Sequence, residues 1–314
     1  MHICYIIIII NMMNPYINNF INTLSLSWDN PKPLLLDVVF EGGLFNGSYL
    51  AGCLFYLKGL EKRNLICIQR LSGCSIGAIT SLLYFIDNDE IMLHIYQLAS
   101  QQFKAKHNLD MFNSLFTLIR SSLPSDIIEK INGKLYICYY NVKTRKQIVK
   151  HNYKNVNDLF ETIRRSCSFP YVIDNKIYYK KKYIDGLYPY IFKNSKNKIL
   201  YLNIHHFNKI GGIISIKNEP TNVQRILEGI LEIHIFFLHG DKTNICSFTD
   251  EWTLLDICSH YVFIKIMDLL FILLHYIYII RKILEDSKDN ELGQLDIYKL
   301  LRHVYVYFLK KYCV

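Results

Sequence analysis

The order of elements over residues 34–86 constrains the fold most strongly. Leu34–Phe40 is a short apolar run that predicts a buried strand, and apolar residues at helical spacing follow over 48–60. Ile66–Leu71 is again strand-like, and 78–86 is apolar enough for a buried helix. A strand–helix–strand–helix order of this kind is typical of an α/β domain with parallel strands.

A G-x-S-x-G pentapeptide, Gly73-Cys74-Ser75-Ile76-Gly77, joins the second predicted strand to its helix. Glycines at these two positions remove Cβ atoms that collide at a sharp strand-to-helix turn, so the serine hydroxyl stands clear of the sheet. The flanking strand and helix are the context in which this motif marks a nucleophile. An ordinary tight turn is the alternative interpretation.

A serine nucleophile needs hydrogen-bond donors where negative charge develops on the substrate. The turn Gly42-Gly43-Leu44-Phe45-Asn46-Gly47 lies between a predicted strand and a helix N-terminus, where free backbone N–H groups point outward. Its first two glycines allow a ligand to approach the backbone closely. The turn is therefore a candidate oxyanion site, although two glycines after a strand are also typical of a simple turn.

The sequence leaves open which base activates Ser75. In one scheme Asp185 ends a strand and takes the serine proton directly, because Gly186 gives a tight turn that aims the carboxylate. In the other scheme Ser75 belongs to a Ser-Asp-His triad. The candidate acids of that triad are Asp174 and Asp185, and its candidate bases are His205, His206 and His239.

Four segments resemble, in order, the four motifs of the patatin-like phospholipases. They are Phe40–Gly52, Ser72–Ile79, Ile163–Pro170 and Tyr183–Pro189. The resemblance covers about residues 36–206. It implies a three-layer α/β/α fold with a mainly parallel central sheet, and hydrolysis of lipid esters without a metal or other cofactor.

The resemblance also implies roles for individual residues. Ser75 would be the nucleophile and Asp185 its base, without a catalytic histidine. Backbone amides of the turn would form the oxyanion hole, and further glycines would shape the loop and the serine turn. The oxyanion residues are Gly42, Gly43 and Leu44, and the shaping glycines are Gly47, Gly73, Gly77 and Gly186.

Three positions depart from the family pattern. Leu44 replaces the usual third glycine of the loop, Asn46 replaces a basic residue, and Leu187 replaces the glycine or alanine after Asp-Gly. These departures motivate a rival hypothesis, a catalytically weak or inactive protein that binds lipid or membranes with the same fold. A Cys74 thiol hydrolase is a lesser alternative, because Cys74 occupies a variable position of the motif.

We expect an N-terminal lead-in over 1–33, a catalytic domain over 34–206 and a helical C-terminal extension over 207–314 that packs on it. The polar, proline-containing stretch 11–33 predicts a loop, and Tyr178–Ile184 predicts a strand. Helices are expected over Thr221–Phe237 and Thr253–Leu284.

Tyr261–Ile280 is strongly apolar but contains Lys265, Asp268 and His275. Charged groups near the centre of a bilayer are costly. We therefore expect a buried core helix here rather than a transmembrane span.

The net charge of +9 favours anionic partners. Lys180, Lys181 and Lys182 lie between two tyrosines near Asp185 and are a candidate contact for anionic lipid headgroups, a solvated turn being the alternative. We find no nucleic-acid recognition motif, so no nucleic-acid partner is expected. The expected partner is a lipid substrate at a membrane or lipid-droplet surface.

Nine cysteines, without a C-x-x-C pair, favour a reducing compartment without disulfides or zinc. The apolar block Ile3–Ile10 lacks the basic flank and cleavage site of a signal peptide and is too short to span a bilayer. We therefore expect a cytoplasmic protein that associates peripherally with membranes.

Overall fold

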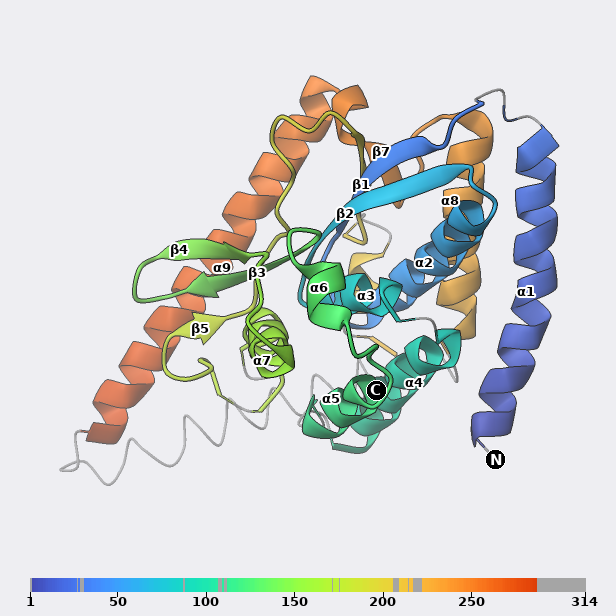
Figure 1. Cartoon of the computed structure of the whole chain (residues 1–314). Helices are drawn as coiled ribbons and strands as arrows, with labels where there is room; N and C mark the ends of the chain where they lie inside the picture. The colour runs from blue at the N-terminus through green and yellow to red at the C-terminus, as the bar shows by residue number, and fades with distance from the viewer. Residues whose placement is uncertain are drawn as a thin grey trace.

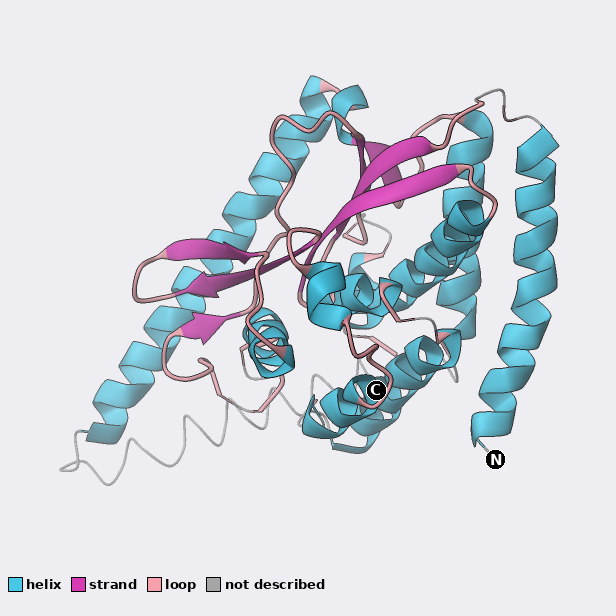
Figure 2. Cartoon of the chain, in the orientation of Figure 1, coloured by secondary structure: helices cyan, strands magenta, loops and turns pink. Residues whose placement is uncertain are grey.

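The computed structural model describes residues 2–26, 28, 31–86, 88–106, 109, 112–170, 172–174, 176–205, 209–213, 215–216 and 222–286. Within these residues one mixed sheet is flanked by helices (Figures 1 and 2). Its strands are β1 (Leu34–Phe40), β2 (Ile66–Cys74), β3 (Leu135–Asn141), β4 (Lys146–Lys150), β5 (Tyr183–Ile184), β6 (Lys198–Leu202) and β7 (Cys246–Phe248).

The described helices surround this sheet. They are α1 (His2–Leu26), α2 (Gly47–Lys62), α3 (Ile76–Tyr84), α4 (Asp89–Lys106), α5 (Phe112–Arg120), α6 (Ile127–Ile131), α7 (Val156–Ser166), α8 (Val223–His239) and α9 (Leu254–Asp286). Short 3₁₀ turns are η1 (Leu44–Asn46), η2 (Ile210–Ile213) and η3 (Thr249–Glu251).

Parallel strands form the centre of the sheet. The order is β4-β3-β2-β1-β6-β7, with β5 paired to β3. The pairs β1–β2, β1–β6 and β2–β3 are parallel, whereas β4, β5 and β7 add antiparallel pairs. The predicted α/β class is thus confirmed. Since the parallel strands share a direction, the segments that follow β1, β2 and β6 meet at one edge of the sheet.

The alternation of side chains along β1 builds two apolar layers. Val38 and Phe40 are buried in the main core with residues of α2 and α3, whereas Val39 packs on the other face with Tyr201. The ring of His260, near the start of α9, lies 5.4 Å from that of Tyr201. Figure 1 accordingly shows α1, α2 and α8 on one side of the sheet and α9 on the other.

Two glycines let the backbones of α2 and α8 touch. A Cβ atom on Gly52 would collide with the carbonyl oxygen of Ile226, and one on Gly229 would collide with that of Tyr49. Helices approach this closely only where side chains are absent from the contact. The close approach fixes α8 against α2 and therefore against the loop that precedes α2.

The expected loop over 11–33 is wrong, because α1 continues as a helix to Leu26. Its described apolar residues Met13, Ile17, Ile21 and Leu24 recur at helical spacing and are buried. Pro15 lies inside the helix without ending it.

The strand expected over Tyr178–Ile184 is shortened to its last two residues. The preceding residues form a tight turn in which Tyr179 bridges Tyr183 and the φ angles of Lys180 and Lys181 are 49° and 59°. Left-handed angles such as these cannot continue a strand.

The buried core helix expected over Tyr261–Ile280 is also wrong. The residues lie in α9, but most of the side chains described there are exposed, and Phe271 is its buried hydrophobic residue. Among the residues described, none of the helices has the length and apolar character needed to cross a membrane.

Replacing Gly229 by alanine should destabilise the protein by about 2 kcal/mol or more, because the new methyl group meets backbone rather than a movable side chain. Gly59→Ala in α2 is the matched control, since a Cβ there meets the flexible end of Ile21. Chemical denaturation measures both. Equal stability losses in the two variants would contradict the backbone contact.

Candidate active site

Ser75 occupies a strained turn between β2 and α3. Its φ and ψ angles are 52° and −127°, which residues with a side chain rarely adopt. The flanking glycines make the turn possible, because a Cβ on Gly73 would strike the carbonyl oxygen of Gly77 and one on Gly77 would strike that of Phe40. The predicted strand–turn–helix context of the motif is present, and the Ser75 side chain is largely buried.

The segment 166–168 bonds to Ser75 on one side and to Asp185–Gly186 on the other. The Ser75 N–H donates to Ser166 Oγ at 3.0 Å, and the Cys167 thiol donates to the Ser75 carbonyl at 3.2 Å. The Asp185 N–H donates to the Ser168 carbonyl at 3.1 Å, and the Gly186 N–H to the Ser166 carbonyl at 3.2 Å. This segment, called the clamp below, brings together residues more than one hundred positions apart.

Asp185 is buried beside Ser75. Burial raises the pKa of its carboxyl group from 3.8 to about 7, against the opposing effect of hydrogen bonds from the Ser75 side chain and the Leu187 and Gly186 amides. Its Oδ2 atom nevertheless makes no hydrogen bond of normal geometry to a described residue. The Ser75 interaction is therefore long or poorly aligned, as catalytic hydrogen bonds often are before substrate binds.

The glycine-rich loop lies directly against Ser75. A Cβ on Gly42 would lie 3.1 Å from Ser75 Cβ, and Gly43 has a φ of 154°. Leu44 adopts a φ of 44°, the left-handed region in which glycine is favoured. The family's third glycine position is thus occupied by a leucine without loss of the glycine-like backbone.

Glu41 is buried behind this loop, and His205 is largely buried there. Glu41 Oε2 accepts a hydrogen bond from Tyr201, and Glu41 Oε1 lies 3.9 Å from His205 Nε2. Burial raises the pKa of Glu41 and lowers that of His205 to about 4, so at neutral pH His205 carries no charge.

His205 lies against the glycine-rich loop. A Cβ on Gly43 would lie 3.5 Å from its ring. The amides of Gly42, Gly43 and Leu44 are the candidate oxyanion donors, because they belong to the loop that lies against Ser75.

The histidines considered for a triad lie elsewhere or outside the described residues. His205 lies near Gly43, Glu41 and the ring of Phe263 rather than against Ser75, and His239 is exposed in the last turn of α8. His206 lies outside the described residues. Asp174 pairs with Arg164 at 3.6 Å.

Asn46 is buried, and its side chain links three other segments by hydrogen bonds. Its side chain donates to the Ile204 carbonyl at 3.0 Å and to the Lys209 carbonyl at 2.9 Å, and it accepts from Arg225 at 3.0 Å. A buried guanidinium from α8 therefore reaches the loop at the position where the sequence itself lacks a basic residue. The sequence alone did not identify Arg225, because no motif near it in the chain indicates a hydrogen bond to Asn46.

Comparison with known proteins agrees with this geometry. Residues 38–188 match the family model described as patatin-like phospholipase. This segment belongs to the patatin-like phospholipase family. Proteins with this domain are lipid acyl hydrolases and acyltransferases.

The curated omega-hydroxyceramide transacylase of Mus musculus is 25% identical over 158 residues. That match covers 48% of this chain and 26% of the transacylase, so the chain spans about a quarter of that relative's length. VipD from Legionella pneumophila is a solved structure with 10% identity and a TM-score of 0.28, over 55% of this chain and 49% of VipD.

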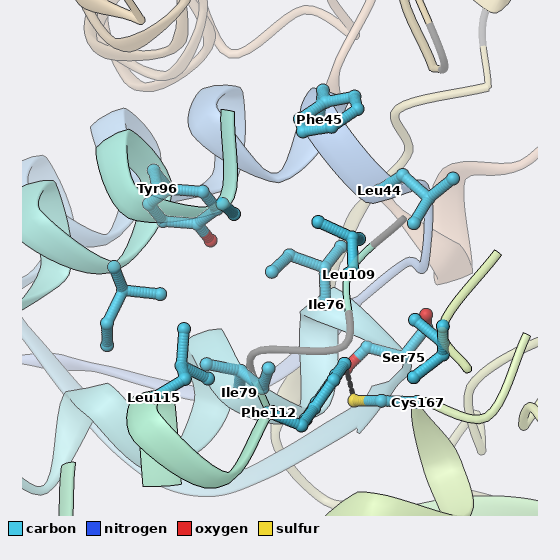
Figure 3. Close-up of a pocket in the computed structure, with 13 residues that line it drawn as sticks. Leu44, Phe45, Ser75, Ile76, Ile79, Tyr96, Leu109, Phe112, Leu115 and Cys167 are labelled. Carbon is cyan, nitrogen blue, oxygen red and sulfur yellow. Dashed lines mark hydrogen bonds between the residues drawn. The ribbon is translucent and has the colours of Figure 1, made fainter. Parts of the chain in front are cut away.

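An apolar pocket of the patatin-like domain opens beside Ser75 (Figure 3). Its cavity of about 60 Å³ is lined by η1, α3, α4 and α5, and Ser75 and Cys167 lie at one side of it. The labelled apolar lining residues are Leu44, Phe45, Ile76, Ile79, Tyr96, Leu109, Phe112 and Leu115. A chain of methylene groups fits such a lining, which offers few hydrogen bonds.

In the part of the chain that the structure describes, no three His, Cys, Asp or Glu side chains gather as metal ligands would. Burial raises the pKa of Cys74 and Cys167 well above the usual value, so both remain neutral thiols. A thiol held in this form is a poor nucleophile.

Ser166→Ala should lower the free energy of unfolding by about 1–3 kcal/mol, because it leaves the Ser75 N–H and the Cys138 carbonyl without their partner. Ser168→Ala is the control, since its hydroxyl donates to the Arg164 carbonyl near the end of α7, away from Ser75 and Cys138. Denaturant titration compares the two. A loss no larger than that of the control would contradict the clamp.

Proposed function

We propose that this chain is a lipid acyl hydrolase that uses Ser75 as nucleophile and Asp185 as base. The observation that carries the proposal is the buried Asp185 carboxyl group, which the clamp holds beside a serine in a strained strand-to-helix turn. A carboxyl group with a pKa of about 7 suits general base catalysis near neutral pH. The reaction takes place at a membrane or lipid-droplet surface.

The reaction proceeds in two halves. Ser75 Oγ attacks the ester carbonyl while its proton passes to Asp185, and the Gly43 and Leu44 amides bind the oxyanion. The tetrahedral intermediate collapses, the alcohol leaves with the proton from Asp185, and acyl-serine remains. Water then gives a proton to Asp185 and attacks the acyl-serine. The proton passes from Asp185 to Ser75 Oγ as the fatty acid leaves, which restores both residues.

The apolar pocket beside Ser75 indicates the class of substrate. It holds the acyl chain of the ester, whose carbonyl then lies between Ser75 and the loop amides. An acceptor alcohol in place of water would make the same intermediate an acyl donor, as the name of the mouse transacylase suggests for that protein. Hydrolysis is the simpler reaction, because it needs no second site.

Ser75→Ala and Asp185→Asn should each abolish ester turnover, at least about 10³-fold, because they remove the nucleophile and its base. A fluorophosphonate probe measures the serine directly, and hydrolysis of a lipid ester measures the reaction. Ser72→Ala on the same strand is the control and should label normally. Near-full activity in Asp185→Asn together with loss in His205→Gln would contradict the dyad and favour the triad.

Turnover should rise with pH and level off above about pH 7, because Asp185 accepts the serine proton only when it is ionised. A pH–rate profile of the first-order acylation step measures this rise. A flat profile between pH 5.5 and 8 would contradict a base with a pKa of about 7.

The same titration predicts a stability effect of opposite sign. The folded state keeps the Asp185 proton up to pH about 7, whereas the unfolded chain loses it near 3.8. Stability from this group therefore falls as pH rises through that window. Asp185→Asn should gain stability relative to wild type between pH 5 and 8, by up to about 4 kcal/mol. Thermal melts at pH 5 and pH 8 measure the difference in stability between the variant and the wild type.

A non-catalytic lipid-binding protein is the second candidate. Leu44 and Leu187 both have left-handed φ angles, 44° and 63°, so two of the three departures from the family pattern carry backbone strain next to the site. Folded wild-type protein that fails to react with the fluorophosphonate, yet binds lipid, would favour this candidate over the hydrolase.

A further inference from the structure

The outer face of α9 is an exposed apolar strip. Its members are Leu254, Leu255, Ile257, Tyr261, Val262, Ile266, Leu269, Leu270, Ile272, Leu273 and Tyr276, which are between 38% and 81% exposed. Residues 254–276 extend about 35 Å as a helix. Charge on this stretch is neutralised locally, because Lys265 lies 3.6 Å from Asp268 and Asp256 pairs with Lys242.

The inner face of α9 packs on both flanks of the candidate active site. The ring of Phe263 lies 4.6 Å from that of His205, behind the glycine-rich loop. Phe271 is buried against Leu187, two residues after Asp185, and its ring lies 6.1 Å from that of Phe169 beside the clamp. The helix that carries the apolar strip therefore lies next to the candidate active site.

Two basic turns lie beside α9 at the same edge. One is the β3–β4 turn, where Val142 packs with Phe271, and the other precedes β5, where Tyr178 bonds His275. Figure 1 shows β3, β4 and β5 next to α9. The basic residues of these turns are Lys143, Arg145, Lys146, Lys180, Lys181 and Lys182. All of them except Lys182 are exposed. Glu161 pairs with Lys180.

We propose that α9 and these two turns form a docking surface for an anionic lipid bilayer. The apolar strip lies among the acyl chains at the interface, and the turns contact the headgroups. A second copy of this chain fits less well, because a two-fold contact through α9 would bring the cationic turns of both copies close together. Binding does not require Ser75 chemistry, whereas delivery of lipid to Ser75 rests on the proposed function.

The test is sedimentation of the full chain with vesicles of phosphatidylcholine, with and without phosphatidylglycerol. Every protein in this assay also carries Ser75→Ala, so that no lipid is hydrolysed during the measurement. Leu269→Glu with Leu273→Glu should weaken binding at least tenfold, since each leucine is about half exposed and contributes apolar area to the contact. Arg145→Gln with Lys181→Gln should weaken binding to the phosphatidylglycerol vesicles only.

Leu231→Glu with Ile235→Glu is the matched control. These two side chains are 44% and 45% exposed on α8, on the opposite side of the sheet, and should leave binding unchanged. Wild-type-like binding by the α9 variant would overturn the proposal. A change of oligomeric state in light scattering would assign the face to a second copy, and a large fall in melting temperature would assign it to packing within the chain.

Hydrolysis of a water-soluble short-chain ester separates the two proposals. With Ser75 intact, the α9 variant should keep this activity while losing turnover of vesicle lipid. No esterase activity together with normal docking would refute the proposed function alone. Esterase activity without docking would refute the docking surface alone.

Discussion

The hydrogen bonds of the clamp are the interactions on which the site depends. Ser75 follows β2 and Asp185 follows β5, so nothing in the covalent chain keeps them together. Ser166 bonds the Ser75 amide through its hydroxyl and the Gly186 amide through its carbonyl. Because both contacts are buried, solvent does not compete for them. The geometry of the serine and the aspartate is thus set by a third, intermediate segment.

Strain is concentrated in the same region. Ser75, Leu44 and Leu187 all have positive φ angles, and each lies in or next to one of the motifs. Such conformations persist only where the surrounding structure determines them, here the close packing of Gly77 on the end of β1 and the burial of Leu187 against Phe271. The departures from the family pattern therefore change the conformational energy of the loop and the turn, but leave their backbone path intact.

Local sequence patterns predicted the centre of the sheet well. The run Leu34–Phe40 matches β1, and the serine turn lies where its glycines place it, because these elements follow from apolar periodicity and steric rules. Patterns of this kind do not show what covers a helix. Tyr261–Ile280 was therefore expected in the core, although α9 leaves most of its described face exposed.

Contacts between distant segments were beyond sequence reasoning for a different reason. Asn46 and Arg225 are separated by 179 positions, and their bond depends on the packing of α8 against α2. The clamp was visible in the sequence only as part of Ile163–Pro170, one of the four segments of the resemblance, without its partners. The helical character of α1 was missed because its asparagines and Pro15 are typical of loops, although its buried residues keep a helical period.

The contact between Gly52 and α8 has a consequence for where the chain can be cut. A protein that ended at residue 206, at the edge of the expected catalytic domain, would lack α8 and with it the backbone that fills the groove beside Gly52. The apolar face of α2 would then meet water, and Asn46 would lose the Arg225 guanidinium. α8 is therefore part of the packed core of this domain, although it lies well past the last of the four motifs.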